Sequence, residues 1–167
     1  MEKPNVTIRQ LAAADIEIFQ RIRLEALSLE PSSYASSYED WAGMSRNDWQ
    51  QRLNEPVFVA FVGIEPVAIM GLLRQRAKKL AHRATIVMVY ARKNQRGTGL
   101  AAHLLDIVCA HARDIGIRQL ELAVSAENQA AKRFYERAGF SVVGCIPGGF
   151  VHDGREIDDV LMAKRLI

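Results

Sequence analysis

Hydrophobic positions in the first half of the chain follow the spacing of β-strands. Residues 6–9 alternate between apolar and polar side chains, which predicts a short strand. Residues 57–64 and 67–73 are dense in β-forming side chains, and the turn residues 63–66 between them predict a β-hairpin. Residues 85–90 form a third apolar run, which is typical of a strand buried on both faces.

Four other segments predict helices, two of them from the period of an amphipathic helix and two from their end signals. Apolar residues recur every three or four positions within residues 15–29 and 100–115. Ser45, with an acidic residue three positions later, matches a capping box and predicts a short helix that ends near residue 53. Residues 128–138 predict the last helix, which a glycine follows at its C-terminal end.

Further strand patterns at residues 120–124, 140–145 and 157–166 complete the order β-α-α-β-β-β-α-β-α-β-β. The first half predicts antiparallel pairing, whereas the β-α-β-α-β order of the second half predicts parallel neighbours joined by right-handed crossovers. The predicted fold class is therefore α/β (α+β), with one mixed parallel and antiparallel sheet flanked by helices. Because the 167 residues contain no linker or repeat, we expect a single domain spanning residues 1–167.

Composition excludes several broad classes of protein. Hydrophobic residues make up 49% and charged residues 25%, which argues against disorder. No apolar run reaches the roughly 18 residues of a membrane span, and no apolar segment follows residues 1–5, so no signal peptide is expected. The net charge of +3, from 22 basic and 19 acidic residues, does not indicate nucleic acid. We therefore expect neither a membrane nor a nucleic-acid partner.

The cysteine pattern gives a further expectation. Cys109 and Cys145 lie 36 positions apart without a CxxC motif, so the sequence predicts no metal site. We interpret both as small core residues of a protein in a reducing compartment, and we expect a cytoplasmic location.

A basic turn with two glycines lies between the predicted strand at 85–90 and the predicted helix at 100–115. The first N–H groups of a helix are unpaired and carry partial positive charge, and Gly97 and Gly99 allow a ligand to approach the backbone closely. Arg96 adds a mobile positive charge at the same place. Together these features predict a phosphate-binding loop.

Two other interpretations of this turn remain open. A Walker loop is excluded because no Gly-Lys-Ser/Thr follows. The spacing Gly97-x-Gly99-x-x-Ala102 loosely matches the dinucleotide fingerprint, with Glu121 as the ribose acid of a nicotinamide oxidoreductase. However, Glu121 lies within its predicted strand and not at its end, and an antiparallel half precedes the motif. The other interpretation is a helix start without a ligand.

At these residues the sequence resembles the GNAT superfamily of acyl-CoA-dependent N-acetyltransferases. The acyl-CoA loop of the family, Arg/Gln-x-x-Gly-x-Gly/Ala, reads Arg-Gly-Thr-Gly-Leu-Ala at residues 96–101. A second family segment follows at the usual separation, and its matching positions are Asn128, Ala131, Phe134, Tyr135, Gly139 and Phe140. The resemblance is strongest over residues 85–144.

The resemblance implies acetyl-CoA as the co-substrate and direct transfer of its acetyl group to a primary amine in a ternary complex. It also implies that the main-chain amides of residues 97–101 hold the diphosphate, that residues 89–91 and Asn128 position the pantetheine arm, and that Tyr135 is the general acid for the leaving thiolate. The implied cofactor-binding residues are Val89, Tyr90, Ala91, Arg96, Gly97, Thr98, Gly99, Leu100, Ala101, Asn128 and Ala131.

Neither motif identifies the general base or the acceptor. Glu121 is the best candidate for the base, with His82 or a water chain as alternatives. Residues 25–48 hold five acids and one base, a local charge of −4, which favours a cationic small molecule or a protein or peptide amine but also suits a solvated helix pair. These acids are Glu25, Glu30, Glu39, Asp40 and Asp48. Four aromatic residues of this region either line an acceptor pocket or pack the helices: Tyr34, Tyr38, Trp41 and Trp49.

The basic cluster of residues 74–83 and the phosphate loop both allow more than one function. Five basic residues within 74–83 either contact an acidic partner or the CoA phosphates, or are simply exposed. A non-catalytic CoA-binding regulatory module would carry the same phosphate loop as an enzyme. Family resemblance also makes a homodimer a reasonable expectation.

Overall fold

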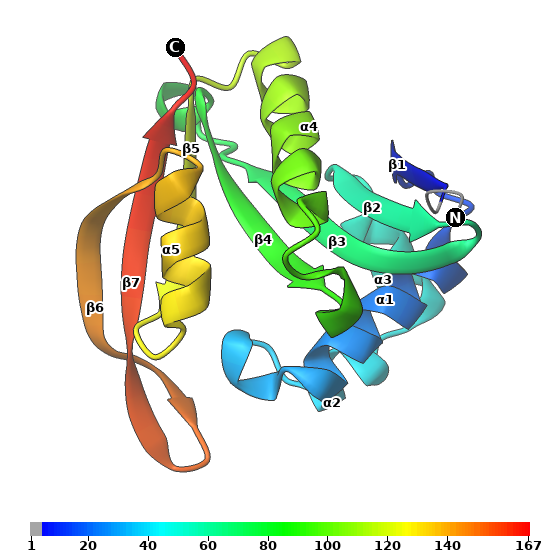
Figure 1. The fold of residues 1–167 in the computed structure, drawn as a ribbon, viewed down its shortest axis with the longest axis horizontal. Coiled ribbons are helices and arrows are strands. Elements are labelled where there is room, and N and C mark those ends of the chain that lie inside the picture. The colour runs from blue at the N-terminus through cyan, green and yellow to red at the C-terminus, as the bar shows by residue number, and fades with distance from the viewer. Residues whose placement is uncertain (1–4) are drawn as a thin grey trace.

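The computed structural model describes residues 5–167 as one twisted seven-stranded sheet with helices packed on it (Figure 1). The strands are β1 (Val6–Gln10), β2 (Val57–Val62), β3 (Glu65–Arg74), β4 (Arg83–Ala91), β5 (Gln119–Ser125), β6 (Ser141–His152) and β7 (Arg155–Arg165). The α-helices are α1 (Ile16–Leu29), α2 (Tyr38–Ala42), α3 (Arg46–Arg52), α4 (Leu100–Asp114) and α5 (Gln129–Arg137). Among these described helices, none combines the length and apolar character that crossing a bilayer requires. The N-terminal stretch in which no signal peptide is expected begins with residues 1–4, which lie outside the described residues.

Two hydrophobic cores lie on opposite faces of the sheet. Alternation along β2 divides its side chains between them, because Val57 and Val59 pack with α1 whereas Phe58 and Ala60 pack with α4. Helices α1 to α3 therefore cover one face of the first four strands, and α4 and α5 lie on the other face (Figure 1).

The strand order is β1-β2-β3-β4-β5-β7-β6, a mixed sheet as predicted. Strands β4 and β5 are parallel neighbours joined through α4, as the pattern predicts. The prediction of parallel neighbours is wrong for β6, because β7 lies between β5 and β6 and pairs antiparallel with both. The reason is that β6 and β7 form a long hairpin, and its second strand takes the place beside β5.

The β4–β5 pairing is short and then opens. Only three residue pairs join the two strands, from Arg83 opposite Gln119 to Thr85 opposite Glu121. Beyond this point β4 carries an extra residue relative to β3, with Met88 at a φ of +58°.

Gly71 on β3 makes room for the Met88 bulge. A Cβ atom at Gly71 would lie 2.4 Å from the Met88 methyl carbon, so a larger residue would displace that side chain. The β4–β5 pairing has ended at Thr85, just before this bulge, and from there the sheet divides into two arms (Figure 1).

Side-chain caps mark the N-termini of α2, α3 and α5. Ser45 caps α3 through the predicted capping box with Asp48. An equivalent box of Ser37 and Asp40 starts α2, a five-residue helix that the periodicity did not predict because it is too short to show a period. At α5, the predicted N-terminal residue Asn128 accepts a hydrogen bond from the Ala131 N–H at 3.1 Å.

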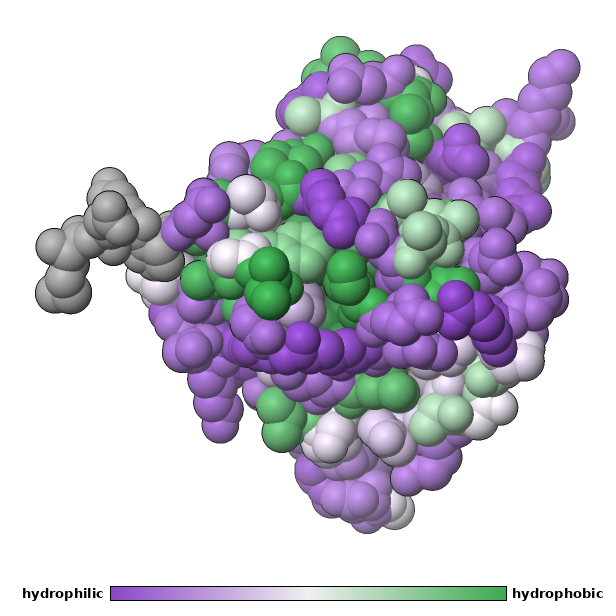
Figure 2. Space-filling model, turned by 90° about the vertical axis from the view of Figure 1, so that its right-hand side faces the viewer, coloured by the Kyte–Doolittle hydropathy of each residue, from purple (hydrophilic) through white to green (hydrophobic). Residues whose placement is uncertain are grey.

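The strands at the two ends of the sheet order differ in character. The side of the molecule that carries β1 is largely hydrophilic, with hydrophobic residues gathered near its centre (Figure 2). On β6, four hydrophobic side chains are exposed: Val142, Val143, Ile146 and Val151. Cys145 is exposed on the same strand, so its prediction as a core residue is wrong, whereas the burial of Cys109 in α4 is confirmed.

Candidate active site

A cavity of about 510 Å³ lies where β4 and β5 separate. Its walls come from β4 and β5, from the turn before α4, from α5, and from the segment after α1. Its lining residues are Glu30, Ser33, Tyr34, residues 86–91, Arg96, Gly97, Ala101, residues 122–125, Asn128, Ala130, Ala131, Phe134, Tyr135 and Arg137. Most of the predicted cofactor residues therefore line this cleft, although Thr98, Gly99 and Leu100 do not.

The turn before α4 has the backbone shape that an anion site needs. Gly97 and Gly99 have φ angles of +76° and +85°, which side-chain-bearing residues rarely adopt. Gly99 is the N-cap of α4 and offers no side-chain cap, so among the described residues the N–H groups of Ala101 and Ala102 in the first turn of this 15-residue helix have no side-chain partner and are open to a ligand. The Thr98 hydroxyl donates to the Gln95 carbonyl at 2.5 Å and accepts the Leu100 N–H at 3.3 Å, which holds the turn in shape.

Tyr135 reaches the same cleft from α5. The side chain is 6% exposed and makes edge contacts with the rings of Phe134 and Phe140. Burial raises the pKa of the phenol well above its usual value, so Tyr135 is a protonated donor at neutral pH.

Tyr34 enters the cleft from the opposite wall. Its hydroxyl donates to the Val89 carbonyl at 2.8 Å, directly beside the Met88 bulge. Burial raises the pKa of this phenol as well. The sequence marked Tyr34 as one of four aromatic residues in the region, but the contact with β4 spans 55 positions and no local pattern indicates it. Trp41 and Trp49 pack against Phe19 in the core, and Tyr38 is exposed.

Glu121 does not line the cleft, although its neighbour Leu122 does. Its carboxylate accepts hydrogen bonds from the Arg83 guanidinium, including one of 2.7 Å from Nη2, and from the Gln119 amide at 3.0 Å. The Arg83 hydrogen bonds hold the pKa of Glu121 below its usual value. Glu121 thus belongs to the last β4–β5 pair, opposite Thr85, where the two strands begin to separate, and its carboxylate is held by Arg83 and Gln119.

The acetyltransferase (GNAT) family model matches residues 19–140, which covers the phosphate turn, the diverging strands and Tyr135. The chain belongs to the GNAT family. The GNAT fold is also found in solved structures over nearly the whole chain. A GNAT acetyltransferase from Streptococcus pneumoniae has a TM-score of 0.85 at 24% identity, covering 96% of this chain and 99% of that one. The yncA protein of Salmonella typhimurium, solved with its cofactor acetyl-CoA, has a TM-score of 0.83 at 21% identity, covering 98% and 95%.

Curated relatives of this GNAT chain are similar over shorter stretches. A mycothiol acetyltransferase from Brachybacterium faecium is 29% identical over 115 residues, 65% of this chain and 35% of that protein. The L-methionine sulfoximine/L-methionine sulfone acetyltransferase of Pseudomonas aeruginosa is 33% identical over 78 residues, 47% of this chain and 45% of that protein. The chain thus matches between about a third and a half of the length of these relatives.

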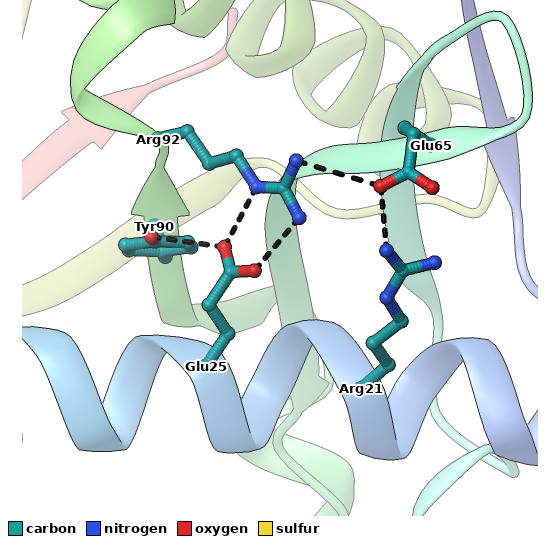
Figure 3. Close-up of polar contacts among 5 residues, drawn as sticks. All are labelled: Arg21, Glu25, Glu65, Tyr90 and Arg92. Atoms are coloured by element: carbon teal, nitrogen blue, oxygen red, sulfur yellow. Dashed lines mark hydrogen bonds and ion pairs between the residues drawn. The ribbon is translucent and has the colours of Figure 1, made fainter.

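A polar network ties α1 to the end of β4 beside the GNAT cleft (Figure 3). Glu25 accepts the Tyr90 hydroxyl at 3.0 Å and two hydrogen bonds from the Arg92 guanidinium at 2.9 and 2.8 Å. Glu65 on β3 lies 3.6 Å from Arg92 and 2.5 Å from Arg21. This network fixes the position of β4 just before the phosphate turn, and no local pattern in the sequence indicates it.

The charged clusters of the sequence are mostly paired in the structure. Of the five acids in residues 25–48, two bind arginines and two cap helices: Glu25 with Arg92, Glu30 with Arg96, Asp40 with Ser37 and Asp48 with Ser45. Three of the five bases at the β3–β4 connection pair with acids: Arg74 and Arg76 with Glu55, and Arg83 with Glu121. Neither cluster is therefore a continuous surface of one charge.

Arg23 is a buried cation behind Tyr34. Its side chain is on α1, the residue is 3% exposed, and its Nε and Nη1 atoms have no hydrogen-bond partner among the described residues. The guanidinium lies 5.0 Å from the Tyr34 ring centroid and 4.5 Å from that of Trp41, within cation–π range. Burial lowers its pKa to about 10, so it stays charged at neutral pH and supports the Tyr34 ring against the cleft.

Replacing Glu25 with Gln is expected to destabilise the fold by about 2 kcal/mol at pH 7, because charge-assisted hydrogen bonds to Arg92 are lost. The Arg92 hydrogen bonds lower the pKa of Glu25 in the folded state from its ordinary 4.5. Its stabilisation is therefore complete above that value and is lost as the pH falls through the lower folded pKa.

Urea unfolding of both proteins at pH 7 and at about pH 3 measures this. The difference between wild type and variant should shrink in acid. Glu17→Gln is the control, because Glu17 pairs with Arg46 on the exposed surface and its loss should not move the unfolding midpoint. Equal midpoints for Glu25→Gln and wild type at pH 7 would contradict the role of the network.

Proposed function

We propose that this chain is an N-acetyltransferase that moves the acetyl group of acetyl-CoA to a primary amine by direct attack in a ternary complex. The observation that carries the proposal is that a single cleft extends from the glycine turn before α4 to the Tyr135 side chain. Open N–H groups at a helix N-terminus suit a diphosphate, and a buried phenol suits a leaving group that needs a proton. The cleft thus offers a binding site for each end of the co-substrate.

The chemistry assigns a task to each wall of the cleft. The neutral amine nitrogen attacks the thioester carbon, a C–N bond forms and the C–S bond breaks. A main-chain N–H among residues 89–91 would stabilise the charge on the thioester oxygen, an effect worth about 3 kcal/mol for one donor. Tyr135 gives its proton to the leaving thiolate and recovers one, through water, from the nitrogen that has been acetylated.

The sequence-based prediction that Glu121 is the general base can be tested directly. Because its carboxylate is held by Arg83 and Gln119 and does not line the cleft, Glu121→Gln is expected to keep kcat within about twofold of wild type. The melting temperature of the variant should fall, since the ion pair is lost. A tenfold or greater fall in kcat with an altered pH–rate profile would instead establish Glu121 as the base. The proton of the acetylated nitrogen would then pass to Glu121 and not through water to Tyr135.

Thiol release from acetyl-CoA tests the whole proposal. The panel of acceptors comprises spermidine, amino acids, aminoglycosides, peptide amines and L-methionine sulfone, the last because a relative is named for it. We expect turnover with at least one amine. Binding of CoA without thiol release toward any amine would overturn the proposal in favour of a regulatory module, and preferential binding of a nicotinamide dinucleotide would overturn it as well.

The remaining expectations extend this proposal to the protein as a whole. We propose one catalytic domain per chain, a cytoplasmic location and assembly as a homodimer. Sedimentation of the purified protein gives its mass in solution and tests the last of these.

A further inference from the structure

The Arg96 side chain of the phosphate turn is bound to Glu30 and to the Ala91 carbonyl. Its Nη2 atom lies 2.6 Å from a carboxylate oxygen of Glu30, and its Nε donates to the Ala91 carbonyl at 3.2 Å. Glu30 follows the last residue of α1, so this ion pair crosses the cleft from the first half of the chain to the phosphate turn. About half of the Arg96 side chain is exposed, which leaves it free to take another partner.

Glu30 differs from the other acids of residues 25–48. Glu25 is held by Arg92 and Tyr90, and the carboxylates of Asp40 and Asp48 cap helices. Glu30 alone in this group lines the cleft, and its only described ion-pair partner is an arginine of the phosphate turn. Glu30 also lines a second hollow of about 400 Å³, together with Glu25, Tyr90 and Arg92.

We propose that Glu30 is a binding residue for a cationic acceptor, and that arrival of the coenzyme releases it for this task. This inference rests on the proposed function and deepens it. A diphosphate bound at the open N–H groups of the glycine turn carries more negative charge than a single carboxylate. It therefore attracts the Arg96 guanidinium more strongly than Glu30 does. Glu30 then loses its cation while it lies at the edge of the cleft. An ammonium group of the acceptor replaces the lost partner.

The proposal couples the two ligands. The coenzyme strengthens binding of the cation, and by linkage the cation strengthens binding of the coenzyme by the same factor. Before the coenzyme arrives, Arg96 occupies the carboxylate and a cationic amine finds no free anion there. The acceptor site is therefore complete only in the presence of the coenzyme.

Calorimetric titration of Glu30→Gln with CoA tests the release step. The variant should bind CoA about threefold more tightly than wild type, because Arg96 no longer has to leave a carboxylate. Pantetheine lacks the diphosphate, so its affinity should be the same for both proteins. In an Arg96→Gln background the Glu30 substitution should no longer change CoA affinity, which a general structural effect of Glu30 would not produce.

Titration with spermidine tests the acceptor step. Wild-type protein saturated with CoA should bind spermidine about tenfold more tightly than protein without CoA, and Glu30→Gln should lose this difference. Glu39→Gln removes an exposed acid of α2 outside the cleft and should behave as wild type. Equal CoA affinities for wild type and Glu30→Gln, or an unchanged CoA effect on spermidine in that variant, would overturn the inference.

The two proposals fail in distinguishable ways. If the protein binds no CoA or releases no thiol with any amine, the proposed function fails. If the protein binds CoA and acetylates an amine while Glu30→Gln matches wild type in both titrations, only the inference about Glu30 fails.

Discussion

Replacing Tyr135 with Phe is expected to lower kcat by about 100-fold while leaving the dissociation constant of CoA unchanged. The substitution removes only the hydroxyl, so the ring still packs between Phe134 and Phe140. Without that hydroxyl the thiolate must leave unprotonated, and general acid catalysis typically contributes about 100-fold or more. Steady-state kinetics with the best amine of the panel, together with calorimetric titration of CoA, measures the two quantities separately.

A second tyrosine of the same cleft provides the control. The Tyr34 hydroxyl is committed to the Val89 carbonyl, so Tyr34→Phe removes one hydrogen bond but no proposed proton donor. We expect its kcat to fall far less than that of Tyr135→Phe. An unchanged kcat and pH–rate profile in Tyr135→Phe would remove the assignment of the acid.

Replacing Gly99 with Val should weaken CoA binding by about 100-fold or more. At a φ of +85°, a β-branched residue is strained by roughly 1–2 kcal/mol, and relief of that strain would rotate the N–H groups of the turn. The added side chain would also occupy the open space beside the turn, because beyond the adjoining residues no atom lies within 4 Å of the position that a Cβ would take. Calorimetry with CoA measures the loss of affinity.

Gly63→Val separates strain from ligand binding. Gly63 lies in the β2–β3 turn, has a φ of +59° and also has open space around it, so its substitution should lower thermal stability to a similar extent. Its CoA affinity should equal that of wild type because the turn is outside the cleft. Wild-type affinity in Gly99→Val would mean that the diphosphate lies elsewhere.

The features that could be predicted from the sequence are those encoded within a few neighbouring residues. The glycine turn and the Asn128 cap lie in short motifs whose physics is local, whereas the place of Tyr135 was implied by the resemblance to the GNAT family. The two β-forming runs within residues 57–73 and the turn residues between them likewise predicted the β2–β3 hairpin, which the structure confirms.

The features that could not be predicted depend on contacts between distant segments. Either strand of the β6–β7 hairpin could in principle pair with β5, and no local pattern in the sequence determines that β7 takes this place. The pairing of Glu121 with Arg83 follows from the register of β4 on β5, which periodicity leaves undetermined. Tyr34 and Glu30 reach the cleft only because α1 packs across β3 and β4.

The short pairing between β4 and β5 has a consequence for the range of acyl groups that this fold can accept. With three residue pairs joining the two arms, backbone hydrogen bonding does little to set the width of the opening. The spacing depends instead on the side chains of one buried cluster, which holds residues of β3, of β5 and of α4, among them Leu104 and Val108. Bulkier or smaller residues at such positions would change the distance between the arms, and with it the size of acyl group admitted, while every strand keeps its register.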